Sequence, residues 1–416
     1  MVCEPDLIVV DWTSSILEIA VFDRGGCGYE LRSSFTLPTR VALRQNAGGE
    51  ISYLFGAAIV DEEEEHTILF RHPGRDLPKI DDVDLQTALL TAVWRGLHQS
   101  LISEGLLSPG QVASVYLIPR AQFTPPLLEQ LRRCASQTSL RLCSTITSAT
   151  ALVMGALGLA AFVEDLSLIA NSKEITAGCF VLREEILEGV CFYYETAGPN
   201  DHRIVIRDHF HVRRDALSQR LSETDCSNPN VGLVLEASES SASAKGKNVA
   251  FMEQVAGAGQ WRHLQWPAEV SLKLMGCAET ASFAAGESTN PARIEISHVY
   301  NLGIQINQSR FHPLISSEQL KSARFPTAGS QSFRLSRNPG DELRLNFCGG
   351  YSTGTADSVS LGRVQLSHSE LNAITTDTFL AASIRLDTPS SGEFFLGLMP
   401  ENRILRQQSF MLPVLA

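Results

Sequence analysis

The chain has 416 residues, of which 44% are hydrophobic and 19% are charged, as is usual for a globular protein of two or three domains. Its formal net charge of −12 argues against a role dominated by nucleic-acid binding, and we infer no direct contact with nucleic acid.

Targeting and membrane signals are weak. Asp6 and Asp11 interrupt the first apolar run, so no signal peptide is expected. The most apolar stretch, 149–163, is shorter than the roughly 20 residues of a spanning helix.

Nine scattered cysteines without a CxxC pair predict reduced thiols, and we expect Cys179 and Cys191 to be small buried side chains. A cytoplasmic protein without membrane contact is the expectation.

The N-terminal half alternates strand and helix signals. Two β-branched runs, 7–10 and 16–22, flank the polar turn 11–15, and glycines at 25–28 mark a second turn. Apolar residues at helical spacing follow over 84–103. A charged loop is predicted at 61–66, before this helix. After the helix come a strand at 112–118, a helix that starts with two prolines at 125, a strand at 140–146 and a buried helix at 149–159. This order predicts an α/β core.

The second half begins with another predicted meander and ends in β structure. The meander comprises 166–170, 177–182 and 190–194, and a Ser/Ala-rich loop follows at 236–248. A helix is predicted from Trp266 to near Gly286. From 294 onward, short alternating segments and frequent turn signals predict an all-β domain, with a boundary at 287–293.

Several of these stretches resemble the seventy-kilodalton heat-shock chaperones of the DnaK type. LIVVDWTSSILEIAVF is similar to that family's first phosphate loop, and VASVYLIPRAQFTPPLLEQLRRC through TSATALVMGALGL parallels a long central stretch. The resemblance implies an α/β actin-like (ribonuclease H-like) two-lobed ATPase domain over 1–286, with shortened insertions. A linker at 287–293 and an all-β substrate-binding-like sandwich over 294–416 would follow, with no helical lid.

The same resemblance implies ATP or ADP with Mg²⁺ as the ligand, held by a degenerate set of residues. Asp11, Thr13, Ser14 and Ser15 match the first phosphate loop, and Thr176 matches the end of the second. That second loop is Asn171–Thr176 here, where the family has Asp-Leu-Gly-Gly-Gly-Thr. Large side chains there hinder a nest of backbone N–H groups from closing on phosphate.

Other positions also depart from the family. Its Glu-Pro pair is Ser148 and Ala149, and Arg71 is the nearest counterpart of its catalytic lysine. We therefore expect no catalytic residues and no ATP hydrolysis. The alternative for Asp11 and the turn serines is that they only satisfy the backbone of a tight turn.

A non-catalytic chaperone or co-chaperone acting through partner proteins is the function that these departures favour. A J-domain protein at the ribosome is the expected partner, with an extended peptide segment added to the β-sandwich. Two alternatives remain: an active ATP-dependent chaperone with a minimal nucleotide site, and a structural subunit of another large assembly.

Two further features concern the second half. His209 and His211 share one strand face, but without a third ligand at sensible spacing we expect no metal site. Apolar residues of the β domain are expected to form mostly core, although some could line a peptide groove; they are Ile304, Ile306, Leu314, Ile315, Phe333, Leu343, Leu345 and Phe347.

Overall fold

The computed structural model contains two compact units. One comprises Met1–Asn171, Leu235–Gly246 and His263–Arg293, and the other Ser172–Val234, Lys247–Arg262 and Ile294–Ala416. The structure describes residues 6–13, 15–26, 28–45, 51–56, 67–80, 82–119, 123, 125–158, 175–183, 186–198, 201–213, 231–236, 261–265, 271–284, 293–298, 301–306, 311–316, 319–320, 326–334, 343–350, 358–372, 379–388, 391–399 and 403–411.

The first unit is built on a five-stranded sheet of order β3-β2-β1-β7-β8. Its strands are β1 (Leu7–Trp12), β2 (Ile16–Gly25), β3 (Gly28–Pro38), β7 (Ala113–Ile118) and β8 (Leu140–Thr145). β1, β2 and β3 form an antiparallel meander, whereas β7 runs parallel to β1 and β8 parallel to β7. The predicted meander and the two later strands are thereby confirmed.

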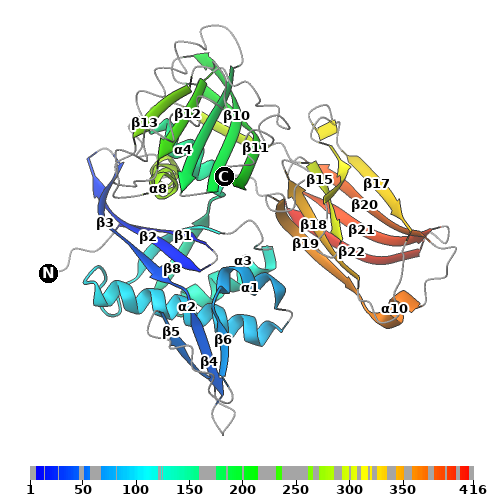
Figure 1. The fold of residues 1–416 in the computed structure, drawn as a ribbon, viewed down its shortest axis with the longest axis horizontal. Coiled ribbons are helices and arrows are strands. Elements are labelled where there is room, and N and C mark those ends of the chain that lie inside the picture. Colours follow the sequence, from blue (N-terminus) through cyan, green and yellow to red (C-terminus); the bar gives the residue numbers. More distant parts are fainter. Residues whose placement is uncertain are drawn as a thin grey trace. The chain divides into compact units, whose positions relative to one another are not determined.

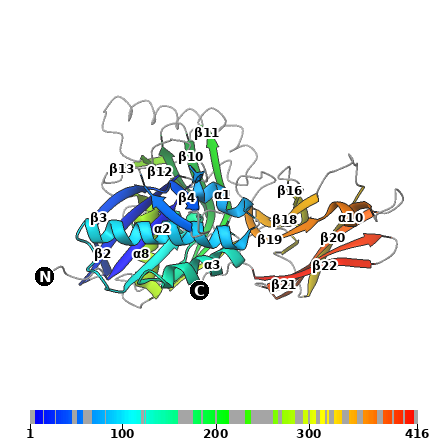
Figure 2. The same ribbon diagram turned by 90° about the horizontal axis from the view of Figure 1, so that it is seen from below.

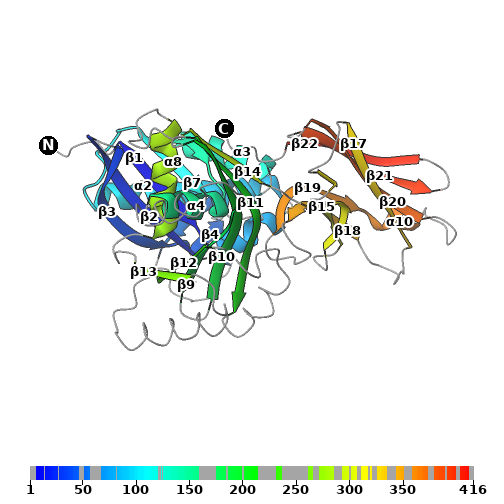
Figure 3. The same cartoon turned by 90° about the horizontal axis from the view of Figure 1, so that it is seen from above.

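Helices cover both faces of this sheet, as Figures 1, 2 and 3 show. On one face α2 (Val83–Ser103) and α3 (Pro125–Ser136) share a buried cluster with Ile8, Val10 and Trp12 of β1. On the other face α8 (Leu272–Ala284) and α4 (Ser148–Leu157) pack with Leu7 and Val9. Successive residues of β1 therefore alternate between the two cores, as the period of two in a strand requires.

A small sheet of order β5-β4-β6 completes the described part of this unit. It consists of β4 (Val41–Gln45), β5 (Ile51–Phe55) and β6 (Thr67–Phe70), and β4 and β5 contact α2. A short helix and a single 3-10 turn, α1 (Pro73–Asp76) and η1 (Leu77–Lys79), link β6 to α2.

A six-stranded sheet of order β13-β12-β9-β10-β11-β14 belongs mainly to the second unit. Its strands are β9 (Ile175–Arg183), β10 (Ile186–Gly198), β11 (Asp201–Arg213), β12 (Val231–Glu236), β13 (Trp261–Gln265) and β14 (Arg293–His298). β9, β10 and β11 again form an antiparallel meander. As in the first sheet, the meander's first strand has the later strands on its other side.

Two four-stranded sheets follow in the second unit, with orders β16-β15-β18-β19 and β17-β20-β21-β22. The strands are β15 (Asn301–Ile306), β16 (Phe311–Ile315), β17 (Thr327–Phe333), β18 (Leu343–Gly350), β19 (Ser358–Leu366), β20 (Phe379–Thr388), β21 (Ser391–Met399) and β22 (Arg403–Met411). Both sheets contribute to one buried apolar cluster. The eight apolar residues predicted as core all belong to it, with Ile306 and Phe333 partly buried.

Among the described residues after 293, helical structure is limited to α10 (His368–Asn372) and the residue pair 319–320. No long helical lid is therefore seen in the described part of the chain. None of the described helices is long and apolar enough to cross a membrane. Cys179 and Cys191 are fully buried, as predicted.

Not every predicted element can be compared with the structure. The helix predicted from Trp266 begins at Leu272, because Ser271 is not helical and caps it. Residues 61–66, 166–170, 266–270, 287–292 and all but the first residue of 236–248 lie outside the described residues.

Candidate functional site

The candidate site lies at the turn between β1 and β2, beneath the start of α8. Leu7 and Val9 face the α8 side of the sheet, so strand alternation directs Asp11 to the same side. Asp11 is only 3% exposed, although carboxylates are rarely buried without a partner. The position therefore requires a cation or several hydrogen-bond donors nearby.

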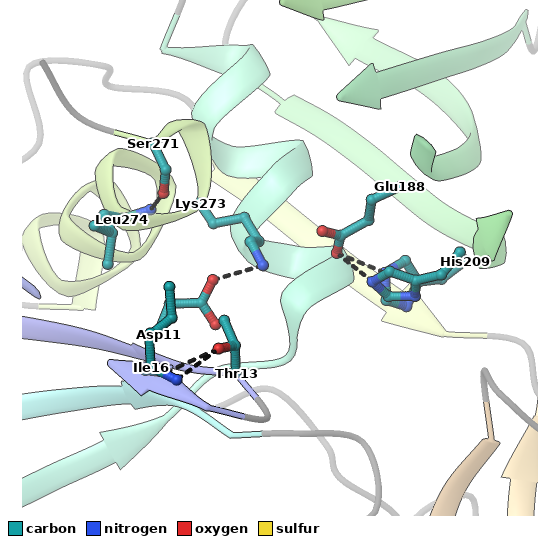
Figure 4. A network of polar contacts seen from close by, with 9 residues as sticks. Asp11, Thr13, Ile16, Glu188, His209, Ser271, Lys273 and Leu274 are labelled. Carbon is teal, nitrogen blue, oxygen red and sulfur yellow. Dashed lines mark hydrogen bonds and ion pairs between the residues drawn. The ribbon is translucent and has the colours of Figure 1, made fainter. Parts of the chain in front are cut away.

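Lys273 in the first turn of α8 supplies that cation. Its Nζ lies 2.5 Å from Asp11 Oδ2, and its side chain is 9% exposed. Figure 4 shows the ammonium group pointing down from α8 to the carboxylate at the end of β1. The Ser271 hydroxyl caps α8 by accepting from Leu274 N at 3.3 Å, and this fixes where the helix begins. The pair joins the two elements through a buried ion pair.

The N-terminus of α8 has opposite electrostatic effects on the two charges of the pair. A lysine in the first turn faces the positive end of the helix dipole, which is unfavourable, whereas the Asp11 carboxylate is favoured there. One turn further along α8, Cys277 is fully buried. Burial, together with the nearby negative charge of Asp11, raises the pKa of the Cys277 thiol well above its ordinary value. That thiol is therefore a packing residue and not a nucleophile.

Thr13 closes the turn with its own side chain. Its hydroxyl donates to Ile16 O at 2.9 Å and accepts from Ile16 N at 3.2 Å, while Thr13 N donates to Ile16 O. The Thr13 side chain therefore satisfies the local backbone of this turn. A Cβ added to Gly74 would lie 2.3 Å from Thr13 O, so α1 packs directly against this turn.

Of the remaining predicted site residues, Ser15 lies in the same turn and Thr176 lies in a strand of the second unit. Ser15 is half-buried and its carbonyl accepts from Thr39 N at 2.9 Å, whereas Ser14 lies outside the described residues. Thr176 is half-buried in β9, in the second unit. Asp11, Thr13 and Ser15 are thus brought together within one turn. Residues 171–174 of the second loop are not among the described residues.

Two further positions belong to the departures from the chaperone pattern. Ser148 is the first residue of α4, which Thr147 caps by accepting from Thr150 N at 3.2 Å. Arg71 is an exposed side chain just after β6.

These groups do not fit a magnesium-nucleotide complex. Mg²⁺ needs carboxylate or water oxygens, yet the carboxylate of this turn is buried and already paired with an internal ammonium group. The Thr13 hydroxyl is engaged within the turn, and α1 covers its carbonyl. We therefore derive no catalytic step through a bound nucleotide.

Lys273 is the residue that sequence reasoning missed. The only available signal was a lysine near the start of the mostly apolar and small-residue segment LKLMGCAETASFA, together with an acidic residue of unknown partner at position 11. Neither signal connects residue 11 to residue 273, because their contact depends on how α8 packs on the sheet.

Comparisons with known proteins leave the family open. No protein-family model matches the chain, and a search of curated proteins finds no significant match.

Proposed function

We propose that the chain is a non-catalytic member of the seventy-kilodalton heat-shock chaperone type. It acts in the cytoplasm as a chaperone or co-chaperone through protein partners, with a J-domain protein at the ribosome as the partner and nascent-chain folding as the process. The proposal joins the sequence resemblance to the chemistry of the β1–β2 turn. It includes the actin-like two-lobed fold over 1–286 and a β-sandwich over 294–416.

The strand orders support this fold proposal. In each of the two larger sheets, the first strand of a three-stranded antiparallel meander has two later strands on its other side, and the six-stranded sheet adds β14 next to β11. A repeated sheet of this kind is what a two-lobed actin-like domain requires. The shared apolar cluster of the two C-terminal sheets supports a sandwich, since stacked sheets bury their facing sides.

The buried ion pair between Asp11 and Lys273 is the main observation in support of the proposed loss of catalysis. In the chaperones that the sequence resembles, the equivalent carboxylate helps to hold Mg²⁺ through water. Here a lysine of the chain itself neutralises that charge. A bound cation would have to displace an ammonium group at 2.5 Å from a site that is almost closed to solvent.

Purified protein is accordingly expected to show no steady-state hydrolysis of Mg-ATP. The physical reason is that in-line attack needs a positioned metal ion and water, and the turn has no available carboxylate to hold them. Phosphate release measured under saturating Mg-ATP checks this, and calorimetry with Mg-ATP and Mg-ADP tests binding separately.

The control is Asp11→Asn, which keeps the shape of the side chain and removes its charge. Circular dichroism must show that this variant is folded. Turnover in the natural protein that disappears in folded Asp11→Asn would contradict the proposal and favour an active ATP-dependent chaperone.

Affinity purification of the full chain from its own cells, followed by mass spectrometry, tests the partner. We expect a J-domain protein and ribosomal proteins to co-purify at a salt concentration that removes weak surface contacts. A stoichiometric complex with neither client peptide nor translation machinery would reject this proposal. That result would instead support a structural subunit of another large assembly.

A further inference from the structure

The hairpin of β10 and β11 brings together two histidines and a glutamate that are separated in the sequence. Glu188 of β10 pairs directly with His211 of β11, and His209 pairs with Val190, two residues along each strand. Because residues two apart on a strand point to the same face, all three side chains lie on one side of the sheet. Glu188 is thus a third group of the metal-ligating type beside the two histidines, and the sequence spacing did not reveal it.

The distances from Glu188 to the two imidazoles are close to those between neighbouring ligand atoms around a small cation. Glu188 Oε1 lies 3.0 Å from His209 Nε2 and 3.4 Å from His211 Nε2. With metal–ligand bonds of 2.0–2.1 Å, the edge of a tetrahedron is about 3.3 Å long. The three ligand atoms all lie within 4.8 Å of one another, and the imidazole rings meet edge to face with centroids 5.1 Å apart.

Burial divides the cluster into a fixed base and an open side. The side chains of Glu188 and His209 are each 9% exposed, whereas that of His211 is 44% exposed. A carboxylate at the depth of Glu188 is costly without a positive partner. Figure 4 shows the Glu188 carboxylate pointing at the His209 ring from the neighbouring strand. The exposed side at His211 gives an ion and a fourth ligand a path from solvent.

We propose that Glu188, His209 and His211 form a binding site for a late first-row divalent metal ion, with Zn²⁺ as its occupant. Two imidazoles and one carboxylate with an open position are a ligand set of zinc sites, whereas Mg²⁺ and Ca²⁺ take oxygen ligands. Zinc also binds such mixed sites more tightly than Fe²⁺ or Mn²⁺. In the part of the chain that the structure describes, this is the one cluster of at least three such groups.

The test uses untagged full-length protein that has been freed of metal with a chelator and then dialysed. Calorimetric titration with Zn²⁺ should show one site per chain that is lost or weakened in His211→Ala and in Glu188→Gln. The weakening should be at least tenfold, since loss of even a group that only supports a ligand costs about 10- to 100-fold in affinity. Zinc should also raise the melting temperature of the natural protein more than that of either variant.

Cysteines are the competing zinc ligands, and X-ray absorption separates them from the proposed set. The zinc-loaded protein should show nitrogen and oxygen neighbours at about 2.0–2.1 Å and no sulfur at about 2.3 Å. His312→Ala is the matched control, because it removes a half-buried histidine from β16, in a different sheet. It should bind zinc as the natural protein does.

His211→Ala changes an exposed side chain, so its fold is expected to survive even if Glu188→Gln does not fold. Unchanged zinc affinity in folded His211→Ala, a sulfur shell, or no zinc binding by the natural protein would each overturn the proposal. Glu188 would then simply accept hydrogen bonds from the two imidazoles.

Discussion

Lys273→Met is expected to lower the free energy of unfolding of the first unit by about 3–5 kcal/mol. The substitution keeps the length and apolar stem of the side chain but leaves the Asp11 carboxylate buried without its ammonium partner. Urea denaturation followed by tryptophan fluorescence measures the effect, because the buried Trp12 neighbours Asp11 in β1.

The size of this loss depends on burial and not on the ion pair as such. Exposed ion pairs contribute little, since water solvates each charge when its partner is removed. Asp11 and Lys273 are both almost inaccessible, so removal of one charge leaves the other without either water or partner. Lys79→Met is the matched control: it removes the same charge from an exposed position in η1 of the same unit. It should change stability by less than about 0.5 kcal/mol.

A double variant separates the charge from the packing. Asp11→Asn combined with Lys273→Met removes both charges, and it should recover most of the stability lost in Lys273→Met, because replacing both partners of a buried pair is often neutral. The four proteins form a double-mutant cycle that measures the coupling between the two side chains. A coupling near zero would mean that the two charges do not interact in solution.

Gly276→Ala is expected to destabilise the same unit by about 1–3 kcal/mol or more. A Cβ at Gly276 would lie 1.8 Å from Ala151 O and 2.4 Å from Gly155 N of α4. In return, a Cβ at Gly155 would lie 2.4 Å from Leu272 O of α8. The two helices therefore touch through their backbones, and neither contact can be relieved by turning a flexible side chain.

The sign of this effect is informative. In an isolated helix alanine is more favourable than glycine by about 1 kcal/mol, so helix propensity alone predicts stabilisation by Gly276→Ala. Thermal denaturation of the variant shows which influence dominates. Gly26→Ala is the control, because a Cβ there meets nothing within 4 Å. Increased stability in Gly276→Ala would mean that α4 and α8 are further apart than the structure has them.

Local sequence patterns predicted much of the first unit. The β-branched runs at 7–10 and 16–22 and the helical spacing over 84–103 are properties of neighbouring residues, and the strands and helix form there as expected. The resemblance also directed attention to Asp11, which the structure places at the centre of the candidate site.

The partners of the site residues could not be predicted in the same way. Lys273 reaches Asp11 only because α8 packs on the face of β1 that carries Leu7 and Val9. Glu188 meets His211 only through the register of a hairpin, and a shift of one residue would move it to the opposite face. Both contacts depend on helix packing or strand pairing between residues that are separated in the sequence. The spacing of residue types along the chain does not predict such contacts.

The contact between β1 and α8 has a consequence for synthesis of the chain. Strand β1 leaves the ribosome early and can pair with β2 at once, but α8 is translated only after most of the chain. Until then the face of β1 that carries Leu7, Val9 and Asp11 can be covered only in part, by the earlier helix α4. The nascent chain thus carries Asp11 without its Lys273 partner for most of its elongation. The first unit can therefore complete its fold only after α8 has been translated, although the protein is itself proposed to assist nascent chains.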